Sequence, residues 1–144
     1  MRVFADTSAL LKLYVVEPHA AAVRELAVGA MFAVCRIAWA EAMAAFARRA
    51  REVPTDDGAL LSVRQTFSDN WARLDIVEVS QSVVERAGEY VDIFALRAYD
   101  AVQLAAAAEF ALFLDEPLGF ACFDLRLNKA ARALGMQVAF MGAR

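Results

Sequence analysis

Val3-Phe4-Ala5-Asp6-Thr7-Ser8-Ala9-Leu10, near the start of the chain, determines how the later segments are interpreted. A short apolar run that ends in an acid and continues as an apolar, helix-forming segment is typical of a strand followed directly by a helix. Asp6 is then at the carboxyl end of a strand, the edge where ligands bind in open parallel sheets. An isolated Asp before Thr-Ser is also a good helix N-cap, so both interpretations stay open at this point.

Length and composition limit the class of protein. The 144 residues suffice for one domain with a sizeable core, so a single domain over residues 1–144 is expected. The hydrophobic fraction is 60%, but charged residues interrupt every apolar stretch before the roughly 18 residues that a membrane span needs. Met1-Arg2 leads directly into the predicted strand without a signal peptide, so a cytoplasmic location and no membrane partner are expected.

The chain has too few cysteine and histidine residues for several kinds of active site. Cys35 and Cys122 each end an apolar run, far apart in the sequence, which favours buried reduced thiols over a disulfide or a metal site. The single histidine, His19, leaves no material for a mechanism with several histidine ligands or a histidine base. Any enzymatic activity would therefore depend on carboxylates, acting directly or through a hard metal ion.

Strands and helices alternate along the rest of the chain. Further strands are expected at residues 31–35, 74–79, 119–123 and 137–140. Further helices are expected at residues 17–27, 36–53, 55–71, 80–94, 100–113 and 125–134. Thr55 with Asp56 and Asp57 would begin one helix, and Ser80 with a capping box from Ser82 to Glu85 would begin another. This order, without a linker or internal repeat, predicts an α/β fold with a mainly parallel sheet.

Four acids fall at strand ends or early in helices. Asp124 repeats the arrangement of Asp6, because an apolar strand precedes it and a helix follows it. Glu41 has mostly apolar neighbours early in its helix, and Asp100 opens an Ala-rich helix. Glu41 could equally be an exposed helix residue, and Asp100 could be only a partner of the helix dipole.

Four blocks of sequence carry a resemblance to a known family. They are Asp6-Thr7-Ser8-Ala9-Leu10-Leu11-Lys12-Leu13-Tyr14, the helix around Glu41, Leu96-Arg97-Ala98-Tyr99-Asp100-Ala101-Val102-Gln103-Leu104-Ala105, and Phe123-Asp124-Leu125-Arg126-Leu127 with Ala130-Ala131. In this order and at these separations they resemble the signature blocks of PIN-domain ribonucleases, particularly the VapC-type toxins of toxin–antitoxin pairs. The resemblance implies a three-layer α/β sandwich whose five-stranded sheet has the order 3-2-1-4-5. Asp6 and Asp124 would then lie on neighbouring strands at the topological switch point.

The resemblance and the charges together imply a metal-dependent endoribonuclease, a hydrolase. Four carboxylates within a few ångströms repel one another and have raised pKa values unless a cation shares the site. Mg²⁺, or Mn²⁺ in its place, prefers such oxygen ligands and would activate water for attack on an RNA phosphodiester. Asp6, Asp100 and Asp124 are the expected direct ligands. Glu41 is expected to bind through water or to position the attacking water.

Five further residues are candidates for supporting the site or contacting the substrate: Thr7, Ser8, Arg97, Gln103 and Arg126. Thr7 or Ser8 would hydrogen-bond a carboxylate or the scissile phosphate. Arg97 and Arg126 would bind substrate phosphates, although a surface cap or an ion pair is an equally good role for each. Cys122 stands where the family often has Thr or Ser, and a thiol is a poorer hydrogen-bond donor, so carboxylate orientation is expected to differ.

The resemblance also implies partners. It implies a homodimer and a VapB-like antitoxin whose tail fills an apolar groove and blocks the site, with DNA contacted only through the antitoxin. Leu13, Tyr14 and Trp39 are apolar residues expected to be exposed and therefore compatible with such a groove. The net charge of −3 is unfavourable for RNA binding, so local arginines, and basic rims aligned in a dimer, would have to compensate.

Other functions remain open. A PIN-fold nuclease that acts in RNA processing outside a toxin–antitoxin pair, and a non-catalytic binding module that keeps the fold, are both compatible with the sequence. A receiver-like domain or an aspartyl phosphatase is disfavoured. Ser8 stands where such phosphatases need a second Asp. Receivers need a lysine directly after a late strand, whereas Lys129 lies inside a predicted helix.

Overall fold

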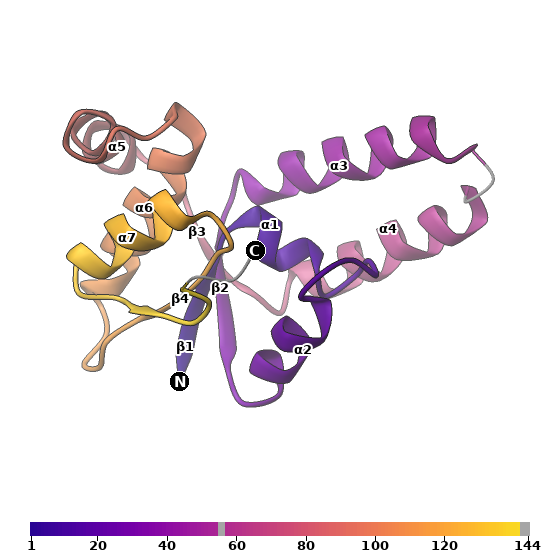
Figure 1. Cartoon of the computed structure of the whole chain (residues 1–144), viewed down its shortest axis with the longest axis horizontal. Helices are drawn as coiled ribbons and strands as arrows, with labels where there is room; N and C mark the ends of the chain where they lie inside the picture. Colours follow the sequence, from indigo (N-terminus) through magenta and orange to yellow (C-terminus); the bar gives the residue numbers. More distant parts are fainter. Residues whose placement is uncertain (55–56, 142–144) are drawn as a thin grey trace.

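The computed structural model describes residues 1–54 and 57–141, and a parallel β-sheet lies at its centre (Figure 1). The strands are β1 (Arg2–Ala5), β2 (Met31–Cys35), β3 (Asp75–Val77), β4 (Gly119–Ala121) and β5 (Gln137–Val138). Their order is β3-β2-β1-β4-β5, and each neighbouring pair is parallel. The predicted fold class and strand order are confirmed. The chain reverses its direction of travel across the sheet between β1 and β4, where ligands bind in such folds.

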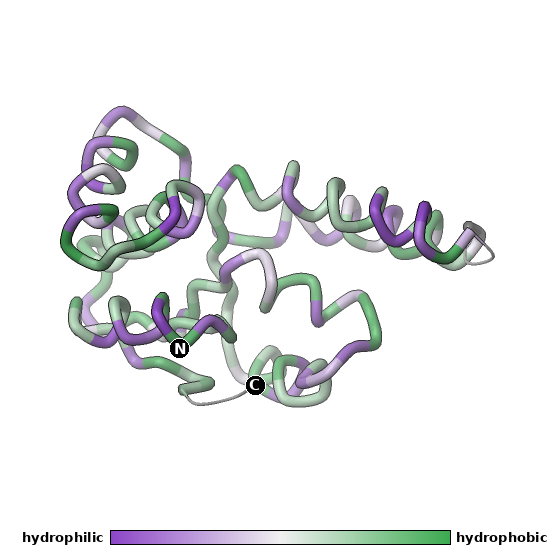
Figure 2. The backbone as a smooth tube through the Cα atoms, turned by 45° about the horizontal axis from the view of Figure 1, so that its top comes forward, coloured by the Kyte–Doolittle hydropathy of each residue, from purple (hydrophilic) through white to green (hydrophobic). Residues whose placement is uncertain are grey.

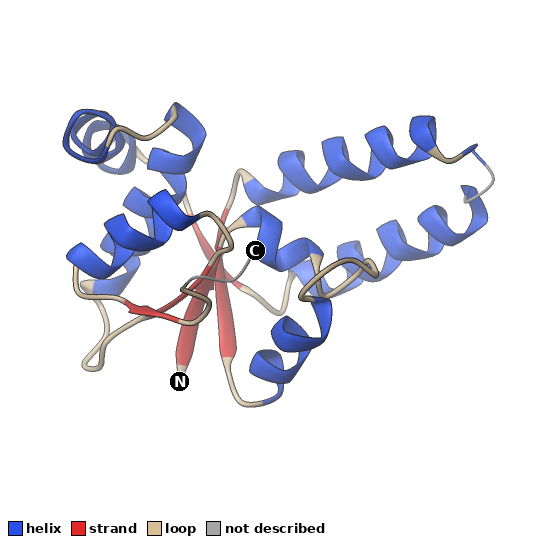
Figure 3. Ribbon diagram, viewed as in Figure 1, coloured by secondary structure: helices blue, strands red, loops and turns tan. Residues whose placement is uncertain are grey.

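Helices cover both faces of the sheet and make the three predicted layers (Figure 3). They are α1 (Thr7–Leu11), α2 (Ala20–Val28), α3 (Ala38–Glu52), α4 (Asp57–Trp71), α5 (Gln81–Phe94), α6 (Ala98–Ala111) and α7 (Leu125–Ala133). Side chains alternate between the faces along a strand. Phe4 therefore packs in the core under α5, α6 and α7, whereas Val3 and Ala5 pack in the core under α1 to α4.

Helices α3 and α4 form a pair that extends away from the sheet, and Figure 2 shows polar and apolar residues interspersed along both. Phe67 anchors the base of this pair. Its ring is fully buried and its centroid lies 5.3 Å from Tyr14, 5.4 Å from Trp39 and 5.7 Å from Phe46. Tyr14 is therefore partly buried against this core, as is Leu13, so the expectation that both are exposed was wrong. Trp39 is exposed, as expected.

Several predicted strands are shorter in the structure. The segments expected at 74–79 and 137–140 form strands only over Asp75–Val77 and Gln137–Val138, and both lie at an edge of the sheet with one pairing neighbour. The segment expected at 119–123 ends at Ala121. Beyond it the Asp124 N–H donates to Cys122 Sγ at 3.2 Å, a local contact in place of a sheet hydrogen bond.

Several helix starts also differ from expectation, since α3 begins at Ala38 and not at residue 36, and α6 begins at Ala98 and not at Asp100. Helix α2 begins at Ala20 and not at residue 17, because His19 has a left-handed backbone with φ of 70°. Helix α5 is capped by Ser80, whose hydroxyl accepts from the Val83 N–H at 3.2 Å. The capping box from Ser82 to Glu85 was therefore wrong: Ser82 lies inside the helix and donates to Glu109 instead. The expected start at Thr55 and Asp56 lies outside the described residues.

Candidate functional site

Asp6 lies at the centre of the sheet, at the carboxyl end of β1 and beside β4. Its N–H donates to the Ala121 carbonyl at 3.1 Å, which ties it to the neighbouring strand. Its side-chain Oδ1 accepts hydrogen bonds from the Ala9 N–H at 2.9 Å and from the Ser8 hydroxyl at 2.8 Å. Asp6 is thus the N-cap of α1, as the simpler interpretation held, and it is also only 8% exposed at the switch point. Ser8 therefore hydrogen-bonds a carboxylate.

The surroundings of Asp6 disfavour its charged form. Burial raises the pKa of the Asp6 carboxyl above its ordinary value. Hydrogen bonds from Ala9, Cys122 and Ser8 oppose this rise, while the nearby charge of Asp100 adds to it. A capping role alone would not need a carboxyl that is buried and close to a second acid.

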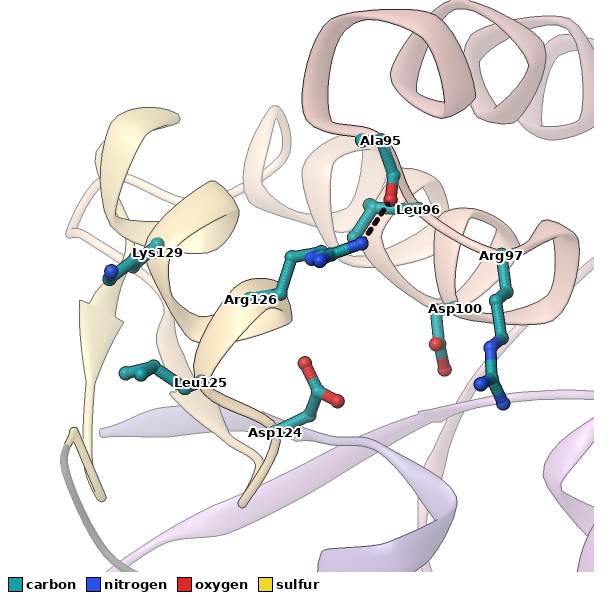
Figure 4. Close-up of a pocket in the computed structure, with 8 residues that line it drawn as sticks. All are labelled: Ala95, Leu96, Arg97, Asp100, Asp124, Leu125, Arg126 and Lys129. Atoms are coloured by element: carbon teal, nitrogen blue, oxygen red, sulfur yellow. Dashed lines mark hydrogen bonds between the residues drawn. The ribbon is translucent and has the colours of Figure 1, made fainter.

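Asp100 and Asp124 line one polar pocket of about 640 Å³ beside the switch point (Figure 4). Asp124 is the N-cap of α7, with Oδ1 accepting from the Leu127 N–H at 2.8 Å, and Asp100 lies in the first turn of α6. Figure 4 shows the two carboxyl groups on facing sides of the pocket. Two acids 24 positions apart in the sequence therefore share one pocket, because the N-terminal ends of α6 and α7 meet there.

The four predicted acids lie at the same edge of the sheet. The charge of Asp100 interacts with each of the other three. Burial raises the pKa of Asp100, the charge of Asp124 raises it further, Arg97 opposes the rise, and Glu41 adds to it. Within residues 1–54 and 57–141, however, no three His, Cys, Asp or Glu side chains are placed so as to hold a metal ion. The expectation of four carboxylates within a few ångströms was therefore too tight.

Glu41 is held by two side chains from other elements. Thr7, the first residue of α1, donates its hydroxyl to Glu41 Oε1 at 2.7 Å. Gln103, on α6, donates from Nε2 to the same oxygen at 2.8 Å and to Thr7 Oγ1 at 3.1 Å. Glu41 is therefore not merely an exposed helix residue. Thr7 and Gln103 both support one of the predicted acids.

Three basic side chains line the pocket of Asp100 and Asp124: Arg97, Arg126 and Lys129. Arg97 extends alongside Asp100, whereas the Arg126 guanidinium turns to the loop before α6 and donates to the Ala95 carbonyl at 3.0 Å (Figure 4). Sequence reasoning missed Lys129 as a pocket residue. Its spacing of three residues from Arg126 on one helix was the available signal, because residues three apart share a helix face.

Cys122 lies against both strand-end acids. It is buried, its Sγ accepts the Asp124 N–H, and it contributes a hydrogen bond to the Asp6 side chain. The Asn128 side-chain amide donates to the Cys122 carbonyl at 2.8 Å and so connects this turn to α7. Burial raises the pKa of the Cys122 thiol, and the charge of Asp6 adds to the rise. Cys35 is buried and free as well, as predicted.

The donor atoms at this site fit a hard divalent cation. Carboxylate oxygens are the ligands that Mg²⁺ prefers, and this ion commonly uses only one or two protein carboxylates and completes its shell with water. Asp100 and Asp124 on one pocket satisfy that requirement. Burial chiefly raises the pKa of Asp100, and the repulsion from Asp124 that adds to the rise is one that a bound cation would offset.

A doubly wound parallel sheet with acids at its switch point defines an α/β protein with an acidic site. The chain belongs to the PIN domain family, which matches residues 3–115. It is 34% identical over 139 residues to Ribonuclease VapC45 of Mycobacterium tuberculosis (strain CDC 1551 / Oshkosh), covering 95% of this chain and 94% of that protein. Ribonuclease VapC49 of M. tuberculosis (strain ATCC 25618 / H37Rv) matches with the same figures. The predicted resemblance is confirmed.

Solved structures show the same fold. A toxin–antitoxin complex from Klebsiella pneumoniae matches with a TM-score of 0.61 and 21% identity, over 85% of this chain and 86% of that chain. VapBC2 from Rickettsia felis, bound to a DNA fragment from its promoter, matches with a TM-score of 0.61 and 12% identity, over 96% and 97% of the chains. In the described part of this chain no helix is long and apolar enough to cross a membrane.

Proposed function

We propose that this PIN-domain protein is a divalent-metal-dependent endoribonuclease and the toxin of a VapBC-type toxin–antitoxin pair. The observation that carries the proposal is the pairing of Asp100 with Asp124 on one pocket, beside Asp6 at the switch point. The similarity to VapC ribonucleases over nearly the whole chain supports the same function. The entire chain, residues 1–144, would act as a single PIN-like domain.

Each of the four acids has a proposed role at the ion. Asp6, Asp100 and Asp124 would bind it directly, and Glu41 would bind it through water or orient the attacking water. When bound, Mg²⁺ or Mn²⁺ would activate water and stabilise the negative charge that develops at the phosphodiester. Burial and the charges of Asp124 and Glu41 raise the pKa of Asp100, and the charge of Asp100 adds to the rise at Asp6, so a bound cation would relieve repulsion among these acids.

RNA phosphates would be bound by the basic side of the pocket. Arg97 extends beside Asp100, where a phosphate held at the acids would lie, and its planar guanidinium can donate two parallel hydrogen bonds. Lys129 would contact a phosphate further along the pocket. Arg126 is committed to the Ala95 carbonyl through one nitrogen and keeps its other donors for substrate. These cations locally offset the net charge of −3.

The proposed partners are those of the toxin class. A VapB-like antitoxin would bind an apolar groove and block the acids, DNA would be contacted only through that antitoxin, and the toxin would form a homodimer. The solved relatives are toxin–antitoxin complexes, which supports an antitoxin for this chain. A cytoplasmic location would give the protein access to RNA, and this location stays a prediction.

RNA cleavage by the purified chain tests the enzymatic proposal. Single-stranded or looped RNA should be cut in Mg²⁺ or Mn²⁺ to leave a 5′-phosphate, cutting should stop in EDTA, and added metal should restore it. Asp100→Asn should abolish cutting, whereas Asp92→Asn, an exposed acid on α5, should leave it unchanged. Cleavage that persists in EDTA would refute the metal mechanism.

Growth of cells that express the chain tests the toxin assignment separately. Expression of wild type should arrest growth, and co-expression of the cognate antitoxin should relieve the arrest. Asp6→Asn should not arrest growth. An active nuclease in the first assay that leaves growth unaffected would instead place the chain with PIN nucleases that process RNA outside toxin–antitoxin pairs.

A further inference from the structure

Gln103 is an unusual residue for its place in the fold. It is 3% exposed on α6, three residues after Asp100 and so on the same side of the helix one turn later. The other buried residues of α6 are apolar: Ala101, Leu104, Ala105, Ala106 and Ala107. A buried primary amide is costly unless its hydrogen bonds are satisfied, so its contacts reveal why the position is polar.

The amide nitrogen of Gln103 closes a triangle of hydrogen bonds. Nε2 donates to Glu41 Oε1 at 2.8 Å and to Thr7 Oγ1 at 3.1 Å, which uses both of its hydrogens. Thr7 uses its own hydrogen to donate to Glu41 Oε1 at 2.7 Å. Both donors therefore converge on a single carboxylate oxygen. Because a carboxylate oxygen only accepts, this contact also sets the orientation of the amide.

The other end of the Gln103 amide is unsatisfied. Oε1 is buried and has no hydrogen-bond partner among the described residues. An unpartnered buried polar atom costs roughly 1–3 kcal/mol. A methionine would fill similar space without that cost, so stability alone does not explain an amide in an otherwise apolar helix face.

We infer that Gln103 is a positioning residue which, together with Thr7, holds the carboxylate of Glu41 in one orientation for metal binding and catalysis. The inference rests on the proposed function, because it concerns the same site. Glu41 lies in the first turn of α3 and has three side-chain torsions. Without the hydrogen bonds from Thr7 and Gln103, which together form a clamp on Glu41, its carboxyl group would sample several positions. The clamp joins α1, α3 and α6, and thus sets Glu41 relative to Asp100.

Removing a side chain that hydrogen-bonds a metal ligand typically lowers metal affinity or activity by about 10–100-fold. Gln103→Met removes both hydrogen bonds that Nε2 donates, at nearly constant volume. Thr7→Val replaces the hydroxyl that donates to Glu41 and accepts from Gln103 with a methyl group in a side chain of similar shape. Each should lower kcat about 10–100-fold, leave KM for RNA nearly unchanged, and raise the Mn²⁺ concentration that gives half of the metal-induced rise in Tm. Gln103→Glu should be worse than Gln103→Met, because it places a second carboxylate against Glu41.

The control variant is Leu104→Val, which shortens a fully buried apolar side chain on α6 and removes no hydrogen bond to Glu41. It should lower Tm in EDTA but keep the wild-type metal response. The specific readout is a double-mutant cycle by thermal melts with Mn²⁺ alone. In a Glu41→Ala background, Gln103→Met should produce no further loss of metal response, because the group that it positions is gone.

The results separate this inference from the proposed function. A wild-type chain that neither cuts RNA nor responds to Mn²⁺ would overturn both. A wild-type chain that does both, with Gln103→Met equal to it in kcat and in Mn²⁺ response, would overturn the positioning role alone. Full additivity of Gln103→Met with Glu41→Ala would overturn it too. If Gln103→Met does not fold, Thr7→Val provides the same comparison, and an unchanged Mn²⁺ response there would refute the clamp.

Discussion

Asp124 faces Asp100 across the pocket, and after burial its charge is the strongest influence that raises the pKa of Asp100 (Figure 4). The two carboxyl groups come from the first turn of α6 and the N-cap of α7. Neither helix needs both acids for its own stability. Their proximity is a property of the site, and it has consequences for stability as well as for cation binding.

Stability of the metal-free protein should depend on pH through Asp6 and Asp100. Both have a pKa in the folded protein above the ordinary value of 3.8, so the unfolded chain loses these protons first. Their contribution to stability is then complete below about pH 3.8 and is lost as pH rises through the folded pKa values. Asp100→Asn should gain stability relative to wild type as pH rises from 3.5 to 7, by no more than about 1 kcal/mol because solvent screens a half-buried group.

Denaturant unfolding in EDTA at several pH values provides the measurement. The exposed residue Asp115 supplies the matched control, since Asp115→Asn makes the same substitution at an acid outside the pocket of Asp100 and Asp124. A constant offset for Asp100→Asn across this range would contradict the raised pKa.

Asp6→Asn should stabilise the metal-free chain by on the order of 1 kcal/mol, because Asn caps α1 about as well and removes a buried charge. The same change should remove most of the response to Mg²⁺. A ligand at about 100 times its Kd stabilises the folded state by roughly 2.7 kcal/mol, so the wild-type Tm should rise clearly on adding metal. Thermal melts of both proteins with EDTA and with Mg²⁺ test this. Equal metal-induced shifts would show that Asp6 does not take part in metal binding.

Arg97→Gln should weaken RNA binding with little effect on metal binding. Because Arg97 lines the acidic pocket, its replacement should raise KM for RNA. The replacement should also make RNA binding less sensitive to salt, so that the slope of log K against log salt falls by about 1. Arg132→Gln, the same charge change at the exposed end of α7, should leave that slope unchanged. Filter binding or fluorescence anisotropy at several salt concentrations gives the slopes, and identical slopes for the two variants would refute a phosphate contact at Arg97.

Both cysteines should be inert in the folded protein. Burial raises the pKa of Cys35 and of Cys122, and the thiolate is the reactive form. A chromogenic disulfide reagent at pH 8 should therefore react with neither thiol in native protein and with both in guanidinium. Rapid modification of Cys122 in the native state would mean that the β4–α7 turn opens readily.

The sequence by itself determined the alternation of strands and helices, the position of an acid after β1 and after β4, and the PIN resemblance from which the strand order followed. These features are local: an apolar run, a capping acid and a helical period are encoded within about ten residues. The caps at Asp6 and Asp124 were likewise predictable from neighbouring residues, because an N-cap side chain accepts a hydrogen bond from a backbone N–H only two or three positions later. The roles of the acids in metal binding stay predictions.

Only the tertiary structure decided which side chains meet. Glu41 is 34 positions from Thr7 and 62 from Gln103, and nothing local in the sequence encodes that their hydrogen bonds close on one oxygen. The exposure of Tyr14 was misjudged for the same reason, since the ring that covers it, Phe67, belongs to the distant helix α4. Local pattern sets which face of an element is apolar. The packing of distant elements sets the rotamers, and therefore the spacing of the acids and the clamp on Glu41.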